Sequence, residues 1–294
     1  DPDPDPDPDP DPDPDPDPDP DPDPDPDPDP DPDPDPDPGD DGPQECPPAA
    51  EFIYLVSDNN TFLKFDPQIA SATEVGVLDC PALGATPFSM AVDRFGVAWV
   101  LYSNGTLWSV DIVTLACSPT PFVAGQNGFE LFGMGFAADG PETTEESLYI
   151  AGGSQFTWMG FANASFGSID LEAYQVQALS TFPVGPGSPE LTGTRNGELW
   201  GFFPTLSPPR IASIEKSTAE LLTTHNLDPF IFGNVQAWAF AHWGGQFYIF
   251  YRGNGDPGTQ VWRVDAETGV AAQVIENIGS VIVGAGVSTC APLE

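Results

Sequence analysis

The stretch Val261-Trp-Arg-Val-Asp265-Ala-Glu-Thr-Gly269 is the clearest copy of a pattern that recurs along this chain of 294 residues. Apolar residues alternate with polar or smaller ones and end on an acid, which predicts a half-buried strand followed by a turn. Four further copies of this pattern occupy residues 62–66, 107–111, 166–170 and, with a one-residue shift, 211–215. The copies are about 45 to 60 residues apart, which indicates a repeat architecture.

Three other segments accompany these copies. Upstream of each lies an apolar segment centred on an aromatic residue: Tyr54, Trp99, Tyr149, Trp200 and Tyr248. Small and apolar residues precede four of these aromatic segments, at 88–92, 133–137, 191–194 and 238–241. Downstream of each copy an outer strand is expected, at 73–78, 117–122, 174–179, 220–224 and 270–275. Each copy therefore predicts a four-stranded unit.

The first unit has no small-residue segment before Tyr54. The missing segment stands at the far end of the chain, as Val281-Ile-Val-Gly-Ala-Gly-Val-Ser-Thr289. A last strand that completes the first sheet closes a ring and removes its open edge. Small residues suit the centre of such a ring because backbones approach closely there. We therefore predict an all-β fold, a five-bladed β-propeller over residues 51–294 that is closed by the C-terminal strand.

The pattern resembles the β-propeller superfamily in general over about residues 51–290, and the resemblance rests on periodicity. The chain has no Gly-His and Trp-Asp pair of the WD type. The turn at 265–269 is similar to turns of quinoprotein-like propellers, where the Asp caps backbone amides. The resemblance implies that the five terminal acids cap turns rather than catalyse a reaction.

Four cysteines, Cys46, Cys80, Cys117 and Cys290, lack the close Cys-x-x-Cys spacing of a zinc site. Two disulfides in an oxidising compartment are therefore expected, with three connectivities possible. Ring closure ranks these connectivities, because Cys290 ends the closing strand and Cys46 lies just before the strand that should pair with it. We predict that Cys46–Cys290 staples the ring, which leaves Cys80–Cys117 between outer strands of neighbouring blades.

Residues 1–38 are Asp-Pro repeated nineteen times, and residues 39–50 form a linker to the propeller. Proline fixes φ near the polyproline II value and donates no hydrogen bond, so the tract predicts an extended polyproline II stalk. At about 3.1 Å per residue it would span on the order of 118 Å. A solvated, disordered spacer is the alternative interpretation.

The tract is also rich in ligands for hard cations such as Ca²⁺, which takes six to eight oxygen ligands in proteins. Polyproline II has three residues per turn while the sequence repeats every two, so carboxylates occur on every side of the rod. The predicted calcium ligands are Asp1, Asp3, Asp5, Asp7, Asp9, Asp11, Asp13, Asp15, Asp17, Asp19, Asp21, Asp23, Asp25, Asp27, Asp29, Asp31, Asp33, Asp35 and Asp37.

The chain carries a formal net charge of −39, with 46 acidic residues against seven basic ones. Such a surface repels nucleic acid and favours cations or basic partners. No apolar stretch approaches the roughly 20 residues of a membrane helix. The start at Asp1 without a methionine predicts a processed mature product. Together with the sequons at Asn59, Asn104 and Asn163, these features predict an extracellular or cell-surface glycoprotein.

The sequence offers few side chains that could form a catalytic site. Some glycoside hydrolases and lectins are five-bladed propellers, and the resemblance places Asp93, Asp139, Arg195, Asn196 and His242 near the axis. Only the two aspartates can form an acid pair for hydrolysis, and both fit turn positions. His225 and His242 have no metal-ligand spacing. The acidic loop residues Glu142, Glu145 and Glu146 can bind a cation weakly, but a solvated loop explains them more simply. No enzymatic activity is expected.

Clustered aromatic residues are the best binding signal. Phe156, Trp158 and Phe161 lie in a glycine-rich insertion of the third unit, and Phe230 and Phe232 lie in a loop of the fourth. Aromatic faces stack on sugar rings, pack against another subunit or cover a blade edge of their own domain. All three roles remain open at this point.

Two functions follow from these observations. The first is an extracellular structural subunit, in which the acidic arm links propeller discs, with Ca²⁺, into a filament or surface matrix by self-association. A contact of this kind is heterologous and generates open fibres unless it closes on itself. The second is a surface-anchored glycan- or protein-binding propeller with the tract as a passive spacer. The two functions differ in whether the arm binds another subunit or serves only as a spacer.

Overall fold

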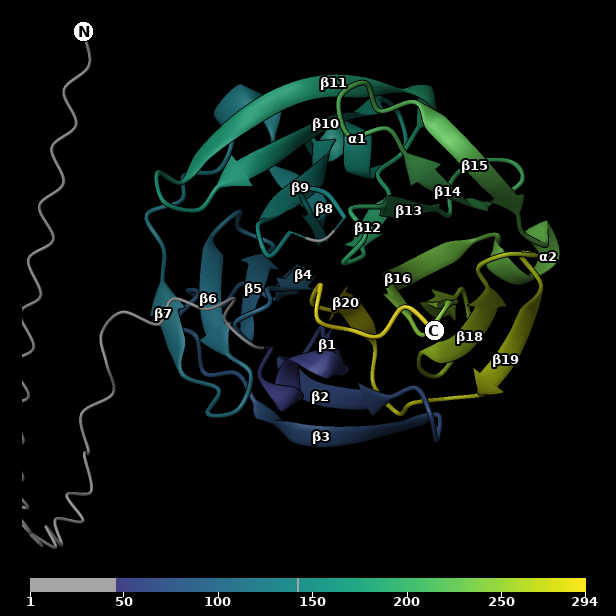
Figure 1. The fold of residues 1–294 in the computed structure, drawn as a ribbon, viewed down its shortest axis with the longest axis horizontal. Helices are drawn as coiled ribbons and strands as arrows, with labels where there is room; N and C mark the ends of the chain where they lie inside the picture. The colour runs from purple at the N-terminus through teal and green to yellow at the C-terminus, as the bar shows by residue number, and fades with distance from the viewer. Residues whose placement is uncertain (1–45, 142) are drawn as a thin grey trace, which may run out of the picture. The chain divides into compact units, whose positions relative to one another are not determined.

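The computed structural model describes residues 46–141 and 143–294. The predicted stalk with all its aspartates, residues 39–45 of the predicted linker, and Glu142 therefore lie outside the described residues. The described chain forms five four-stranded antiparallel sheets that surround a central axis as blades (Figure 1). This architecture is the five-bladed β-propeller that the repeats predict.

Each blade has one strand next to the axis, two in the middle and one at the rim (Figure 1). From the axis outward, blade 1 contains β20 (Ile282–Gly286), β1 (Ile53–Ser57), β2 (Thr61–Asp66) and β3 (Ser71–Val77). Blade 2 contains β4 (Pro87–Val92), β5 (Val97–Tyr102), β6 (Leu107–Asp111) and β7 (Cys117–Pro119). Blade 3 contains β8 (Leu131–Ala138), β9 (Glu146–Gly153), β10 (Asn163–Asp170) and β11 (Gln175–Pro186). Blade 4 contains β12 (Glu190–Gly193), β13 (Leu199–Phe203), β14 (Arg210–Ile214) and β15 (Leu221–Asn226). Blade 5 contains β16 (Val235–Trp243), β17 (Gln246–Gly253), β18 (Gln260–Asp265) and β19 (Ala271–Ile275).

The last strand of the chain completes the first blade. Strand β20 pairs antiparallel with β1, with Leu55 opposite Ala285 in the register. The innermost strands contact one another in the cyclic order β20, β4, β8, β12, β16 and back to β20. The predicted closure by the C-terminal strand is therefore confirmed.

Glycines allow these innermost strands to approach one another. A Cβ atom added to Gly133 would lie 2.3 Å from the carbonyl oxygen of Pro189, and one added to Gly193 would lie 2.3 Å from that of Phe136. Contacts this short do not occur at real Cβ atoms, so the approach of β8 to β12 requires residues without side chains. The small-residue signature of the sequence thus reflects crowding near the axis.

The hydrophobic core consists of five clusters, each at the boundary between neighbouring blades. Phe65 of blade 1, for example, meets Phe250 of blade 5 edge to face with ring centroids 5.3 Å apart. The five aromatic residues at the centres of the second strands are all buried, with at most 9% of their surface exposed: Tyr54, Trp99, Tyr149, Trp200 and Tyr248. The repeats of the sequence therefore pack against one another in the same way at each boundary around the ring.

The acids that end the repeated pattern cap turns. Asp111 Oδ1 accepts hydrogen bonds from the backbone N–H groups of Val113 (3.0 Å) and Thr114 (2.7 Å). Asp265 Oδ1 accepts one from Thr268 N at 2.7 Å. The corresponding acids of the other three blades accept hydrogen bonds from backbone N–H groups two residues on: Asp66, Asp170 and Glu215.

The outer strands depart most from the predicted ranges. Strand β7 ends at Pro119, before the predicted residue 122, because Pro119 and Pro121 have no N–H to donate to a sheet. Strand β11 continues to Pro186, beyond the predicted residue 179. Four short helical turns stand in the connections: η1 (Pro48–Glu51), η2 (Gln126–Gly128), α1 (Gln155–Trp158) and α2 (Pro229–Phe232).

Candidate functional site

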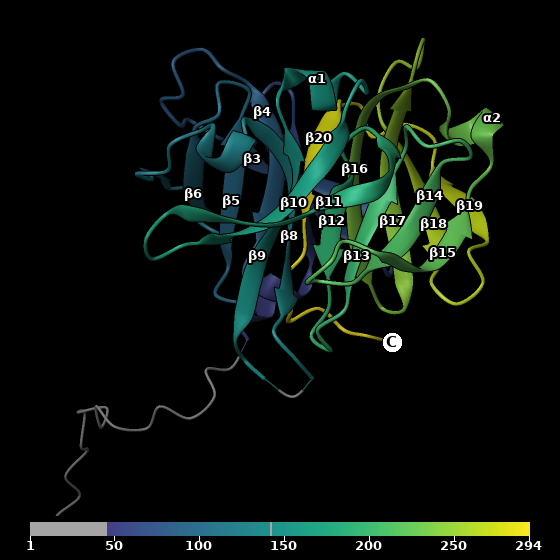
Figure 2. The same ribbon diagram turned by 90° about the horizontal axis from the view of Figure 1, so that it is seen from above.

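The two ends of the central axis differ in character. The innermost strands β4, β8, β12, β16 and β20 run in the same direction, toward the end where Cys46 and Cys290 are joined, which we call the staple end. The opposite end carries α1 and α2, and we call it the helix end. Figure 2 shows α1 and α2 on the upper side and the C-terminus on the lower side.

Both predicted disulfides form. Cys46 is bonded to Cys290 with a Cα–Cα distance of 5.7 Å, and Cys80 is bonded to Cys117 at 5.3 Å. Hydrogen bonds reinforce the staple, since the Ser288 hydroxyl donates to the carbonyl oxygen of Ala50 at 2.7 Å. The start of the described chain is therefore fixed, covalently and by hydrogen bonding, to the end of the closing strand.

Glu146 is a half-buried carboxyl beside the staple. Its Oε1 accepts from the backbone N–H of Arg94 at 2.8 Å, and its Oε2 accepts from the Thr289 hydroxyl at 2.7 Å. Burial raises the pKa of Glu146 to about 7, an effect that these hydrogen bonds oppose. The carboxyl thus joins blades 2 and 3 to the closing segment and titrates near neutral pH.

The two aspartates expected near the axis, Asp93 and Asp139, lie in different environments. Asp93 is buried, and its Oδ1 caps a turn by accepting from Phe95 N and Val97 N, both at 2.9 Å. Burial raises its pKa. Asp139 is exposed, and its carboxylate accepts a hydrogen bond from the Ser147 hydroxyl at 2.7 Å. Each acid therefore serves its own turn.

The other axis candidates occupy different places. Arg195 and Asn196 are exposed at the staple end, where they line a pocket with Arg94 and Thr289. His242 is buried, and burial lowers its pKa to about 4, so the imidazole is neutral at physiological pH. His225 lies on β15, where its Nε2 is 2.9 Å from the carbonyl oxygen of Ala266.

A buried acid that the sequence analysis did not single out lies on the axis itself. Glu190, on β12 of blade 4, is only 2% exposed, and its Oε2 accepts from the hydroxyl of Ser89 on β4 of blade 2 at 3.0 Å. Because blades 2 and 4 are not neighbours, this hydrogen bond crosses the axis. A second one comes from the backbone of Met134, and burial raises the pKa of Glu190 well above its ordinary value. The available signal was an acid directly before the small-residue segment 191–194.

The aromatic candidates divide between core and surface. Phe232 is fully buried, and Trp158 packs against Phe88 at 4.4 Å and stacks on Trp238 at 4.6 Å between ring centroids. For these two residues, packing within the propeller is the role that the structure supports. Phe156, Phe161 and Phe230 are 69%, 71% and 97% exposed, respectively. Exposed aromatic surface therefore lies at the helix end.

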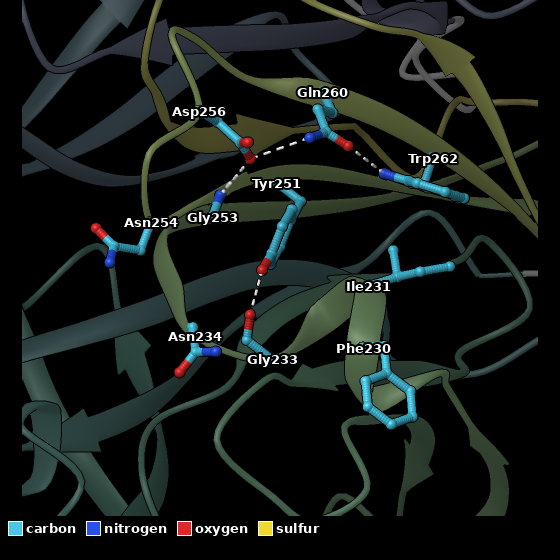
Figure 3. Close-up of a pocket in the computed structure, with 10 residues that line it drawn as sticks. All are labelled: Phe230, Ile231, Gly233, Asn234, Tyr251, Gly253, Asn254, Asp256, Gln260 and Trp262. Carbon is cyan, nitrogen blue, oxygen red and sulfur yellow. Dashed lines mark hydrogen bonds between the residues drawn. The ribbon is translucent and has the colours of Figure 1, made fainter.

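A pocket of about 420 Å³ lies beside Phe230, at the helix end of blade 5. Its walls are α2 and the residues that follow it, the end of β17, the β17–β18 loop and the start of β18. The lining residues are Phe230, Ile231, Gly233, Asn234, Tyr251, Gly253, Asn254, Asp256, Gln260 and Trp262 (Figure 3). We refer to this feature as the Phe230 pocket.

Hydrogen bonds hold the walls of the Phe230 pocket in place. Asp256 Oδ2 accepts from Gly253 N at 2.8 Å and from Gln260 Nε2 at 3.0 Å. Gln260 Oε1 accepts in turn from Trp262 Nε1 at 3.0 Å. The Tyr251 hydroxyl donates to the carbonyl oxygen of Gly233 at the floor. In Figure 3, Phe230 and Trp262 lie on one side and the amides of Asn234 and Asn254 on the other.

The three sequon asparagines are exposed. Asn104 Nδ2 donates to the carbonyl oxygen of Ala82 at 3.1 Å, and Asn163 Nδ2 donates to that of Phe182 at 3.0 Å. Asn59 uses its carbonyl oxygen instead, accepting from the Thr61 hydroxyl at 3.0 Å. An N-linked glycan replaces one of the two amide hydrogens, so Asn104 and Asn163 would each keep one N–H for the hydrogen bond described.

Residues 46–141 and 143–294 meet neither the requirements of a metal site nor those of a membrane-spanning helix. These residues contain no group of three or more His, Cys, Asp or Glu side chains placed to hold a metal ion. The helices among them include none that is long and apolar enough to cross a membrane. The predicted calcium ligands belong to the arm, outside the part of the chain that the structure describes.

Comparison with known proteins gives matches only among solved structures. No family model and no curated protein matches the chain. TolB from Acinetobacter baumannii is 15% identical over 76% of this chain, with a TM-score of 0.44, and this chain spans about half of the TolB chain (52%). A chain of a nidogen/laminin complex is 12% identical, with 80% of this chain and 97% of that one covered and a TM-score of 0.49. Hydrazine synthase of Kuenenia stuttgartiensis gives 12% identity, coverage of 76% and 65%, and a TM-score of 0.40.

These similarities carry no argument about function. The class of this protein is defined by its own sheet order, which is that of a five-bladed β-propeller closed by its last strand and by a disulfide.

Proposed function

We propose that this chain is an extracellular structural subunit, a propeller disc that is linked through its acidic Asp-Pro arm, together with Ca²⁺, into a filament or surface matrix. The observation that carries the proposal is the difference between the two ends of the disc. The described chain begins at the staple end, where Phe95 is the one strongly exposed aromatic residue, while the other three of the described chain, Phe156, Phe161 and Phe230, lie at the helix end. Two unlike surfaces suit a heterologous contact, which propagates rather than closing as a two-fold dimer does.

The staple suits a subunit that bears tension. A pull on the arm reaches the propeller at Cys46, and the disulfide passes it directly to Cys290 and the closing segment. Without this bond the load would fall on the hydrogen bonds that hold β1 to its neighbours. Two disulfides also favour an oxidising compartment, which supports the extracellular or cell-surface location in this proposal.

The charge of the arm is the reason for including Ca²⁺. Nineteen carboxylates in 38 residues repel one another and repel a propeller that is itself acidic. Hard divalent cations bind carboxylate and carbonyl oxygens, and both are dense in the arm. Bound Ca²⁺ would neutralise the arm and bridge it to other carboxylates.

Removal of calcium is expected to dissociate assemblies of the full-length chain. Negative-stain micrographs and light scattering of the same sample before and after EDTA measure this directly. Adding excess Ca²⁺ back should restore the assemblies. Adding Na⁺ at the same concentration instead of Ca²⁺ should not restore them. Assemblies that persist through complete chelation would contradict the role of calcium.

The alternative function is a surface-anchored binding module with a passive spacer. The Phe230 pocket favours it, because aromatic rings and amides together suit a sugar or a peptide. A glycan array probed with the full-length chain tests this alternative, and uniform blanks count against glycan binding. We propose no enzymatic activity, since Asp93 and Asp139 each cap or brace a separate turn.

A further inference from the structure

We propose that the Phe230 pocket binds an Asp-Pro segment from the arm of a second copy of this chain. The inference rests on the proposed function and names the docking site that such a linkage requires. Three observations carry it: an aromatic side chain that the core does not use, a pocket that offers both this ring and amide groups, and the placement of the pocket on the disc.

Phe230 is exposed although the segment that holds it is fixed by contacts with the core. Two residues further along α2, Phe232 is fully buried, and its ring lies 5.6 Å from that of Tyr251 and 5.4 Å from that of Trp262. Asp228 caps the helix by accepting from Phe230 N at 2.8 Å. Phe232 therefore anchors α2, and Phe230 is presented to solvent with 97% of its surface exposed.

The pocket matches one side of a polyproline II rod of alternating Asp and Pro. Proline-rich segments dock on grooves lined by aromatic rings, with little loss of entropy because the rod is preformed. Residues on one face of the rod are three apart, or about 9 Å, so each face presents Pro and Asp in turn. The exposed ring of Phe230 offers surface to a prolyl ring. The accessible lining of the pocket is otherwise mostly polar, and the amides of Asn234 and Asn254 offer N–H donors to a carboxylate or carbonyl oxygen (Figure 3).

Charged groups of both signs lie in or beside the Phe230 pocket, and Asp228 is one of them, since its Oδ1 accepts from Phe230 N. Asp256 is the one acid among the described lining residues, and its Oδ2 already accepts two hydrogen bonds. Beside it lies Arg252, one of only seven basic residues in the chain, whose Nε donates to the carbonyl oxygen of Asp256 at 3.1 Å. Arg252 lies outside the lining of the pocket, so the hydrogen-bond donors that the pocket offers to the arm are amide N–H groups.

The position of the pocket sets the type of assembly. Strand β17 begins next to Trp243, whose Nε1 donates to the carbonyl oxygen of Glu51 at the staple end, and it finishes at the Phe230 pocket. The described chain thus begins at one end of the disc, and the proposed dock for the arm of another copy lies at the other. Repeating this contact from copy to copy generates an open chain of discs.

Binding of a labelled peptide of ten Asp-Pro repeats to the full-length chain, followed by fluorescence anisotropy, tests this assignment. The variants Phe230→Ala and Asn254→Asp should each weaken binding at least tenfold, the first by removing aromatic surface and the second by adding a carboxylate of the same size. Leu83→Ala removes an equally isolated apolar side chain, 95% exposed, and should leave affinity within about twofold. A peptide of ten Asp-Ala repeats has the same charge without the prolines and should bind at least tenfold more weakly.

Near-ultraviolet circular dichroism of each variant verifies the fold, and the exposure of Phe230 predicts no change. Equal binding by Phe230→Ala, or equal binding of the Asp-Ala peptide, overturns the assignment. So does a glycan that binds wild type and not Phe230→Ala while the Asp-Pro peptide does not bind. If Phe230→Ala assembles normally while loss of the arm prevents assembly, this site fails and the proposed function stands. If loss of the arm has no effect, both fail.

Discussion

Replacing Cys46 and Cys290 together by serine is expected to lower the free energy of unfolding by about 5 kcal/mol. The bond joins residues 244 positions apart, so it removes much of the conformational entropy of the unfolded chain. It also keeps the closing strand β20 in place beside β1. Urea denaturation of the oxidised wild type and the double variant, followed by tryptophan fluorescence, measures the difference.

The second disulfide provides the matched control. Cys80 and Cys117 are 37 positions apart, so their replacement by serine should cost about 4 kcal/mol. Hydrogen exchange separates the two further, because loss of the staple should speed exchange in β20 and β1 while loss of Cys80–Cys117 should not. Protection of β20 that is unchanged without the staple would contradict its role in closing the ring.

Raising the pH from 5 to 8 is expected to remove about 2.5 kcal/mol of folding free energy through Glu146 alone. The pKa of Glu146 is raised from 4.5 to about 7, so between these values the native state holds a proton that the unfolded state has lost. Stability from this group is therefore complete below pH 4.5 and is lost as the pH rises through 7. Asp93 and Glu190 act in the same direction, because burial raises their pKa values also. His242 acts in the opposite direction, because burial lowers its pKa from 6.5 to about 4, and the unfolded state gains a proton there as the pH falls below 6.5.

The variant Glu146→Gln tests this assignment. Its amide keeps an oxygen acceptor for Arg94 N but does not ionise, so the loss of stability that Glu146 contributes between pH 5 and 8 should be absent from the variant. Urea denaturation of both proteins at four pH values gives the comparison. Asp111 and Asp265, whose pKa values are lowered by hydrogen bonds in their turns, oppose the trend only under more acidic conditions. A Glu146→Gln variant whose stability depends on pH between 5 and 8 in the same way as that of the wild type would contradict this account.

The propeller could be predicted because its determinants repeat along the chain. The strands that contain Trp99 and Tyr248 could be predicted because they occur at equivalent positions of the repeat. The innermost strand that the first repeat lacks could be found at the other end of the chain, around Ala285, as the closing strand. The pairing of Cys46 with Cys290 followed from that closure alone. Each of these inferences uses residues that are neighbours in sequence or in an obvious cyclic order.

The site could be predicted only in part, because it depends on contacts between blades and on loops. Glu190 meets Ser89 across the axis, 101 positions away, and no local pattern announces such a contact. Phe230 and Phe232 look alike in sequence, yet a half-turn of helix exposes one and buries the other. The amides that line the Phe230 pocket belong to Asn234 and Asn254, which lie in loops. The composition of these loops is typical of turns and does not predict a pocket.

Sedimentation velocity of the intact chain and of a chain that lacks residues 1–38, both in excess Ca²⁺, tests the central claim most directly. The intact chain should sediment as large assemblies, and the shortened chain as a monomer with an unchanged near-ultraviolet circular dichroism spectrum. A shortened chain that assembles as well as the intact one would contradict the claim that the arm links one disc to the next.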